Sequence, residues 1–163
     1  MTQAVPPEAA GMVFRRCRSP LEQRVVGRLL AGRGIPLAER GGAGTDLFGL
    51  WDLTAPAGEA LAGAAATGPV GDGGEVQLRG IAVAAGAGRQ GLGRRLVCEV
   101  ADSLRARGAA RLVARPAGGA GPTVALLRRA GFAPAGAGRA PTRVSAPRPG
   151  APADEGSWWE LEL

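Results

Sequence analysis

A strand, a glycine loop and a helix follow one another in the middle of this 163-residue chain, and they constrain the fold more than any other segment. Residues 76–83 (VQLRGIAV) are rich in aliphatic and β-branched side chains and predict a strand. Four glycines follow within residues 86–93. Beyond them, apolar residues recur every four positions, which predicts a helix with one buried face: Leu92, Leu96, Val100 and Leu104.

This junction is typical of an anion-binding site. Glycine lets the backbone approach a phosphate closely, and the first N–H groups of a helix have no partner within the helix. The helix dipole adds partial positive charge at the same end. Arg89, Arg94 and Arg95 add full positive charges. The alternative is a glycine-rich turn that binds no ligand, since short motifs often match by chance.

Two common phosphate motifs do not fit this segment. A P-loop requires Gly-Lys-Ser/Thr, and the chain contains no lysine. The dinucleotide motif G-x-G-x-x-G matches Gly86, Gly88 and Gly91, but this match is weak in a chain with 28 glycines and does not open a βαβ unit.

The segment resembles instead the acyl-coenzyme A loop of the GNAT N-acetyltransferase superfamily, Q/R-x-x-G-x-G/A, which follows a strand ending in Ile/Leu-Ala-Val. Residues 78–83 (LRGIAV) resemble that strand, and residues 91–96 (GLGRRL) resemble the loop and helix entry. The Gln or Arg of the motif falls on Gly88, with Arg89 beside it. The resemblance implies acetyl-coenzyme A as co-substrate. It also implies the residues that bind this co-substrate: Ile81, Ala82, Val83, Gly88, Arg89, Gln90, Gly91, Leu92, Gly93 and Arg94.

A second part of the resemblance lies downstream. Family members usually carry a helix that ends in Gly-Phe after the fifth strand, and residues 126–132 (LLRRAGF) resemble it. The family often has an Asn at the start of this helix and a Tyr four residues before the glycine. These positions hold Ala120 and Leu127 here, so the usual phenolic acid is absent.

The rest of the pattern fits the same fold. We expect further strands at residues 12–18, 48–53, 60–67, 110–114 and 157–163. We expect further helices at residues 123–130 and from residue 20 to either Gly32 or Gly34. Residues 34–45 predict a loop or a poorly formed helix. Since these elements are compatible with the family, the resemblance implies an α/β (α+β) GNAT fold, with a mixed, mostly antiparallel sheet of six to seven strands. The resemblance implies that this sheet is splayed between strands 4 and 5 and flanked by about four helices.

The domain organisation is simple. We expect a disordered lead over residues 1–11 and a single GNAT acyltransferase domain over residues 12–163. A Pro/Ala/Arg-rich stretch over residues 136–156 predicts a mobile loop within that domain.

The composition excludes several kinds of active site. The chain has no His, which excludes a Ser-His-Asp triad, a Cys-His dyad and an H-E-x-x-H zinc site. It has no Lys, Tyr or Asn either. Cys17 and Cys98 are the only cysteines and lack C-x-x-C spacing, so we expect no metal site and no disulfide framework.

The charge and hydropathy of the chain indicate where the protein is located and which partners it binds. The net charge of +6 favours anions such as the phosphates of coenzyme A. We expect no nucleic-acid partner, because the arginine content is typical of GC-rich codons and no recognition helix or interleaved aromatic residues accompany it. No apolar run is long enough for a membrane span and no signal peptide is present, so we expect a cytoplasmic protein without membrane contact.

Two carboxylates are candidates for catalysis. Acetyl transfer needs a base for the protonated amine and a donor for the oxygen that gains negative charge. In histone-type members the base is a carboxylate on the fourth strand; that position falls on Gln77, and Glu75 lies on the same face two residues earlier. We predict Glu75 as base, acting directly or through water, and Asp52 as a second base or amine-binding residue. Simpler interpretations are a solvated strand entry for Glu75 and a turn residue for Asp52.

The sequence as a whole predicts an N-acetyltransferase that moves the acetyl group of acetyl-coenzyme A to a primary amine by direct attack in a ternary complex. A small molecule is the first choice of acceptor. A catalytically weak module that binds acyl-coenzyme A, and acetylation of a protein or peptide amine, stay open as alternatives. The sequence is compatible with a homodimer.

Overall fold

A computed structural model describes residues 11–35, 44–56, 60–86, 91–116, 121–135 and 158–163. Apart from Gly11, the predicted N-terminal lead lies outside the described residues. The predicted loop over residues 136–156 and most of residues 34–45 also lie outside them.

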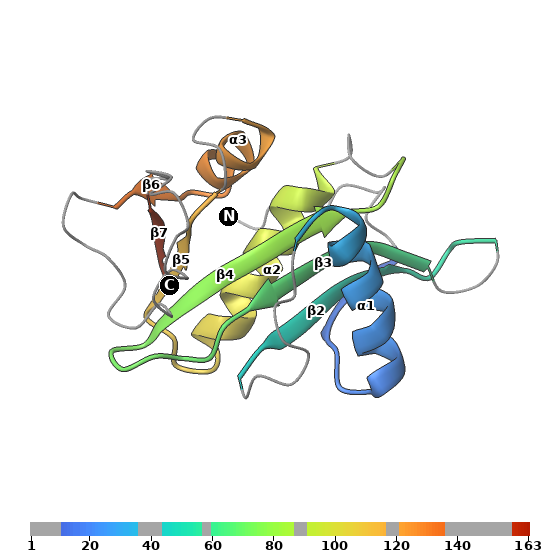
Figure 1. The fold of residues 1–163 in the computed structure, drawn as a ribbon, viewed down its shortest axis with the longest axis horizontal. Helices are drawn as coiled ribbons and strands as arrows, with labels where there is room; N and C mark the ends of the chain where they lie inside the picture. The colour runs from blue at the N-terminus through green and yellow to red at the C-terminus, as the bar shows by residue number, and fades with distance from the viewer. Residues whose placement is uncertain (1–10, 36–43, 57–59, 87–90, 117–120, 136–157) are drawn as a thin grey trace, which may run out of the picture.

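Within the described residues, seven strands form a single sheet in the order β1-β2-β3-β4-β5-β7-β6 (Figure 1). Only β4 and β5 run parallel; the other neighbouring pairs are antiparallel. This confirms the predicted mixed, mostly antiparallel sheet. The strands are β1 (Met12–Arg16), β2 (Asp46–Asp52), β3 (Ala60–Thr67), β4 (Glu75–Val83), β5 (Arg111–Ala114), β6 (Ala133–Pro134) and β7 (Trp159–Glu162).

Three helices lie in the described residues, where the sequence predicted about four. They are α1 (Pro20–Gly32), α2 (Leu92–Arg105) and α3 (Pro122–Arg129). The apolar clusters place α1 on one face of the sheet and α2 and α3 on the other (Figure 1). No helix in these described parts is long and apolar enough to cross a membrane.

Local sequence explains where the helices form. Ser19 accepts a hydrogen bond from the Glu22 N–H, and the Glu22 side chain accepts one from the Ser19 N–H, which is a capping box at the start of α1. Along α2 the predicted apolar face is confirmed, since Leu92, Leu96, Val100 and Leu104 are all buried. These side chains pack on the sheet and make up much of the main core.

The alanine-rich strand β3 lies in the middle of the sheet and is covered on both faces. Ala64 and Ala66 belong to the cluster on the α1 side, whereas Ala65 belongs to the cluster on the α2 side. All three are fully buried. Small side chains here let both helices approach the sheet closely, which explains why β3 lacks the polar alternation of a half-exposed strand.

Candidate functional site

The strands β4 and β5 part in the middle of β4. They pair in parallel from Glu75 with Arg111 to Leu78 with Ala114, where β5 ends. At the same point the register between β3 and β4 shifts, because Ala66 pairs with Gly80 and Thr67 with Leu78. Arg79 is therefore an extra residue on β4. Such a bulge bends its strand, and here it coincides with the separation of β4 from β5.

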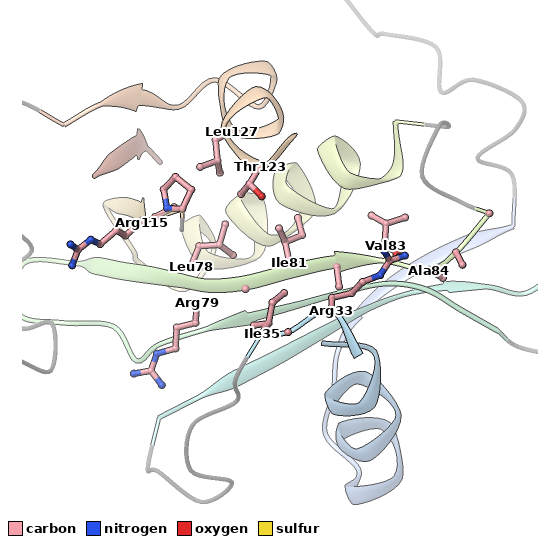
Figure 2. Close-up of a pocket in the computed structure, with 17 residues that line it drawn as sticks. Arg33, Ile35, Leu78, Arg79, Ile81, Val83, Ala84, Arg115, Thr123 and Leu127 are labelled. Atoms are coloured by element: carbon pink, nitrogen blue, oxygen red, sulfur yellow. The ribbon is translucent and has the colours of Figure 1, made fainter. Parts of the chain in front are cut away.

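A cleft of about 640 Å³ opens beyond this point (Figure 2). Its floor is β4, and the described residues that line it come from four segments: residues 33–35 after α1, residues 78–86, residues 114–116 after β5, and Thr123 and Leu127 of α3. Ile81, Ala82 and Val83, which the sequence predicted as cofactor-binding, all line the cleft. Their backbone pairs with β3 on one edge, and no strand of the described residues pairs with the other edge. This edge can therefore offer backbone N–H and C=O groups to a ligand.

The helix α2 begins close to the end of β4. Its N-cap Gly91 has a left-handed backbone (φ +69°), and no side chain caps the helix. The first turn has no acidic residue, and Arg94 is exposed on it. An uncapped helix N-terminus next to a positive side chain suits a phosphate. Gly88, Arg89 and Gln90 lie outside the described residues, so their assignment stays a prediction.

Two further residues of the predicted loop serve packing. Leu92 is buried against the core. A Cβ added to Gly93 would lie 3.3 Å from both Leu126 methyl groups, so this glycine allows α3 to pack closely against α2. Their backbone N–H groups remain at the helix start, where a phosphate would bind.

Glu75 is the first residue of β4 and lies at the paired end of the strand. Its Oε2 accepts a hydrogen bond from Arg111 Nη2 at 2.9 Å, and Arg111 Nη1 donates to Glu160 Oε2 at 3.1 Å. Glu75 is not among the residues that line the cleft, and roughly 10 Å of extended chain separates it from Leu78. Its role as a base stays a prediction.

Asp52 lies at the other end of the sheet, on β2. Its Oδ1 accepts hydrogen bonds from the Thr54 hydroxyl at 2.7 Å and from the Thr54 N–H at 2.8 Å. These hydrogen bonds lower the pKa of the Asp52 carboxyl, which makes it a weaker base. Asp52 is not among the residues that line the cleft, and β3 separates its strand from β4. The structure does not bring the two predicted carboxylates together.

Sequence and structure comparisons identify the family. The sequence model of the acetyltransferase (GNAT) family matches residues 36–132, which is more than half of the chain. The chain belongs to the GNAT acetyltransferase family. GNAT proteins are acyltransferase enzymes that use acetyl-coenzyme A. A comparison with curated protein sequences gives no significant match.

Solved structures agree with this GNAT assignment. A protein assigned to the GNAT family from Desulfovibrio desulfuricans is 26% identical, with a TM-score of 0.66 over 93% of this chain and 98% of that chain. The ribosomal-protein-S18-alanine N-acetyltransferase of Escherichia coli is 23% identical, with a TM-score of 0.64 over 93% of each chain. Spermidine N-acetyltransferase of Vibrio cholerae, in complex with coenzyme A and spermine, is 14% identical, with a TM-score of 0.61 over 78% of this chain and 83% of that chain.

Sequence reasoning missed several residues of the GNAT cleft. Arg33 donates from Nη2 to the Val83 carbonyl at 2.9 Å, although fifty positions separate the two residues. A Cβ on Gly80 would overlap Ile35 Cγ2, so the chain after α1 crosses β4 at this glycine. Arg79 and Arg115 were also missed. The bulge and the end of β5 place them at the cleft, and neither feature has a local sequence signal.

Proposed function

We propose that this GNAT protein transfers the acetyl group of acetyl-coenzyme A to the primary amine of a small molecule, by direct attack in a ternary complex. The observation that carries this proposal is the free edge of β4 from Gly80 to Val83. This edge faces a cleft whose lining follows the chain to Gly86, five residues before Gly91, the N-cap of α2.

The residues present fit acetyl-coenzyme A. When bound, this co-substrate supplies an activated acetyl thioester. Apart from the Val83 carbonyl, which Arg33 binds, the backbone groups of residues 80–83 that face the cleft would hold its amide-containing arm and its thioester carbonyl. Gly91 and the first N–H groups of α2 would hold its phosphates, with Arg94 adding charge. The apolar side chains of Leu78, Ile81 and Leu127 would exclude water from the reacting pair.

The cleft offers little acid–base chemistry. Of the described residues that line it, none is a carboxylate, and Thr123 is the only one with a hydroxyl. We propose that the amine loses its proton to water, either to solvent directly or through water to Glu75. Holding the neutral amine against the thioester can lower the barrier by roughly 7–11 kcal/mol, whereas a general base typically adds about 10²–10⁴-fold in rate. Positioning alone can therefore sustain turnover.

The test is a panel of amines incubated with the full chain and acetyl-coenzyme A, with thiol release as the readout and calorimetry of acetyl-coenzyme A binding beside it. Binding together with turnover of at least one small amine supports the proposal. Binding without turnover of any amine would favour the alternative of a binding module, which the lack of a described carboxylate in the cleft motivates. Turnover confined to peptides would favour a protein acceptor.

A further inference from the structure

The cleft between β4 and β5 carries an excess of positive charge. Of the described residues that line it, Arg33, Arg79 and Arg115 are arginines, and none is acidic (Figure 2). Apart from Thr123, the other lining residues are apolar or glycine. A cleft with low-dielectric walls and charges of one sign attracts ligands of the opposite sign.

These arginines lie at two ends of the cleft. Arg33 binds the carbonyl of Val83, where β4 runs toward the glycine loop. Leu78 and Ala114 form the last parallel pair at the opposite end, and the next residue of each strand is an arginine, Arg79 on β4 and Arg115 after β5. Roughly 13 Å of extended chain separates Arg79 from Val83.

Phosphates bound at the N-terminus of α2 can account for the charge of Arg33, because it lies at that end. They do not account for Arg79 and Arg115 at the other end. Arg79 and Arg115 therefore line the end of the cleft from which the acceptor amine has to enter, since the amine must reach the thioester from the side away from the phosphates.

Arg79 is held in place by a neutral partner, which does not offset its positive charge. Its Nη1 donates to the Thr45 hydroxyl at 2.8 Å, which is a neutral acceptor. Within the described parts of the chain no carboxylate forms an ion pair with it, and its side chain is exposed. The Arg115 guanidinium lies 5.9 Å from the ring centroid of Trp158, a contact that orients the group.

We propose that the acceptor is a small amine that also carries an anionic group, a carboxylate or a phosphate, which binds Arg79 at the end of the cleft that Arg115 also lines. This inference rests on the proposed acetyl transfer. A guanidinium binds such anions through two parallel hydrogen bonds. The same positive charges lower the pKa of a nearby protonated amine, because like charges disfavour the charged form. Binding thus orients the acceptor and also favours the neutral amine that attacks.

The experiment uses acceptors matched in length, so that the amine stays constant and only the far end changes. Each set contains an ω-amino acid, its neutral amide, the diamine and the aminoalkyl phosphate, at several chain lengths. The variants are Arg79→Gln and the control Arg24→Gln, which removes the same charge from an exposed position on α1 outside the cleft. Thiol release from acetyl-coenzyme A gives kcat and KM for each pair.

The anionic members should exceed the amide by about tenfold or more in kcat/KM, and the diamine should be the poorest acceptor. Arg79→Gln should raise KM for the anionic members and leave the amide almost unchanged, while Arg24→Gln should affect neither. The ratio of carboxylate to phosphate turnover then identifies the anion.

Equal turnover across a set, a preference for the diamine, or an unaltered anion preference in Arg79→Gln would overturn this inference and leave acetyl transfer standing. No thiol release with any amine, from protein that still binds acetyl-coenzyme A, would overturn the proposed function and the inference together.

Discussion

The two halves of β4 differ in what they pair with. From Glu75 to Leu78 the strand pairs with β5, and the ion pairs of Arg111 with Glu75 and Glu160 tie β4, β5 and β7 together. From Leu78 to Val83 the strand pairs with β3, and its other edge faces the cleft. The closed half carries Glu75, whose ion pair with Arg111 holds β4 and β5 together. The open half carries Arg79, apolar side chains and backbone groups that face the cleft.

This difference shows how a continuous strand can be both scaffold and binding surface. At the bulge at Arg79, β4 loses its pairing with β5 on one edge and keeps its pairing with β3 on the other, so the strand continues. Its free edge is therefore already in an extended geometry and requires little ordering when a ligand binds.

The largest effect on acetyl-coenzyme A affinity should come from a substitution of Gly91, the N-cap of α2. Gly91→Val places a branched side chain at a left-handed backbone (φ +69°) and should lower the affinity for acetyl-coenzyme A by about 10²-fold or more, equivalent to about 2.7 kcal/mol. Calorimetric titration measures this. Gly108→Val is the matched control, because it introduces the same strain (φ +83°) after the other end of the helix. Equal affinity in the two variants would contradict the assignment of this loop.

A second prediction compares the two carboxylates at the closed end. If Glu75 acts as base through water, Glu75→Gln should lower turnover by roughly 10²-fold, with the smallest loss at high pH. Glu160→Gln removes the other carboxylate partner of Arg111 and should leave turnover unchanged. Each variant should cost about 1 kcal/mol of stability in denaturant unfolding. Identical turnover in both variants would leave Glu75 with a structural role alone.

The pH–rate profile should report the acceptor amine and no group of the enzyme. Turnover should rise about tenfold per pH unit between about pH 7 and the pKa of the bound amine, without a falling limb. The chain has no His, Lys or Tyr, and burial, together with the charge of Glu22, raises the pKa of the Cys17 thiol to about 11. A decline between about pH 8 and 9.5, with the fold shown to persist, would indicate an enzyme acid, and Cys98→Ser would test it first.

The smallest effect on acetyl-coenzyme A affinity should come from a substitution of Gly93, two residues beyond Gly91. Gly93→Ala keeps the backbone N–H and places its Cβ against Leu126, with Val83 Cγ2 at an ordinary contact distance of 3.7 Å, so acetyl-coenzyme A affinity should stay nearly constant. Helix propensity should gain about 1 kcal/mol, and crowding at 3.3 Å should offset part of this gain in a thermal melt. A large loss of affinity would show that Gly93 is required for more than packing.

Local sequence was enough to predict most of the strands and the buried face of α2. Six of the seven strands begin and end within two residues of the predicted bounds, and the predicted face of α2 is buried. The exception is β6 (Ala133–Pro134), which the sequence did not predict. A two-residue strand has no periodicity of its own, and its pairing with β7 defines it.

The sequence by itself determined the strand, the glycine loop and the helix, because periodicity and glycine spacing act between near neighbours in the chain. It also determined which side-chain chemistry is absent, since a missing His or Tyr is missing in any fold. Only the tertiary structure decided that Glu75 would pair with Arg111, that Arg33 would reach Val83, and that Arg79 and Arg115 would flank the cleft. Those contacts depend on strand register and on one extra residue in β4, and register is set by packing between segments distant in the chain.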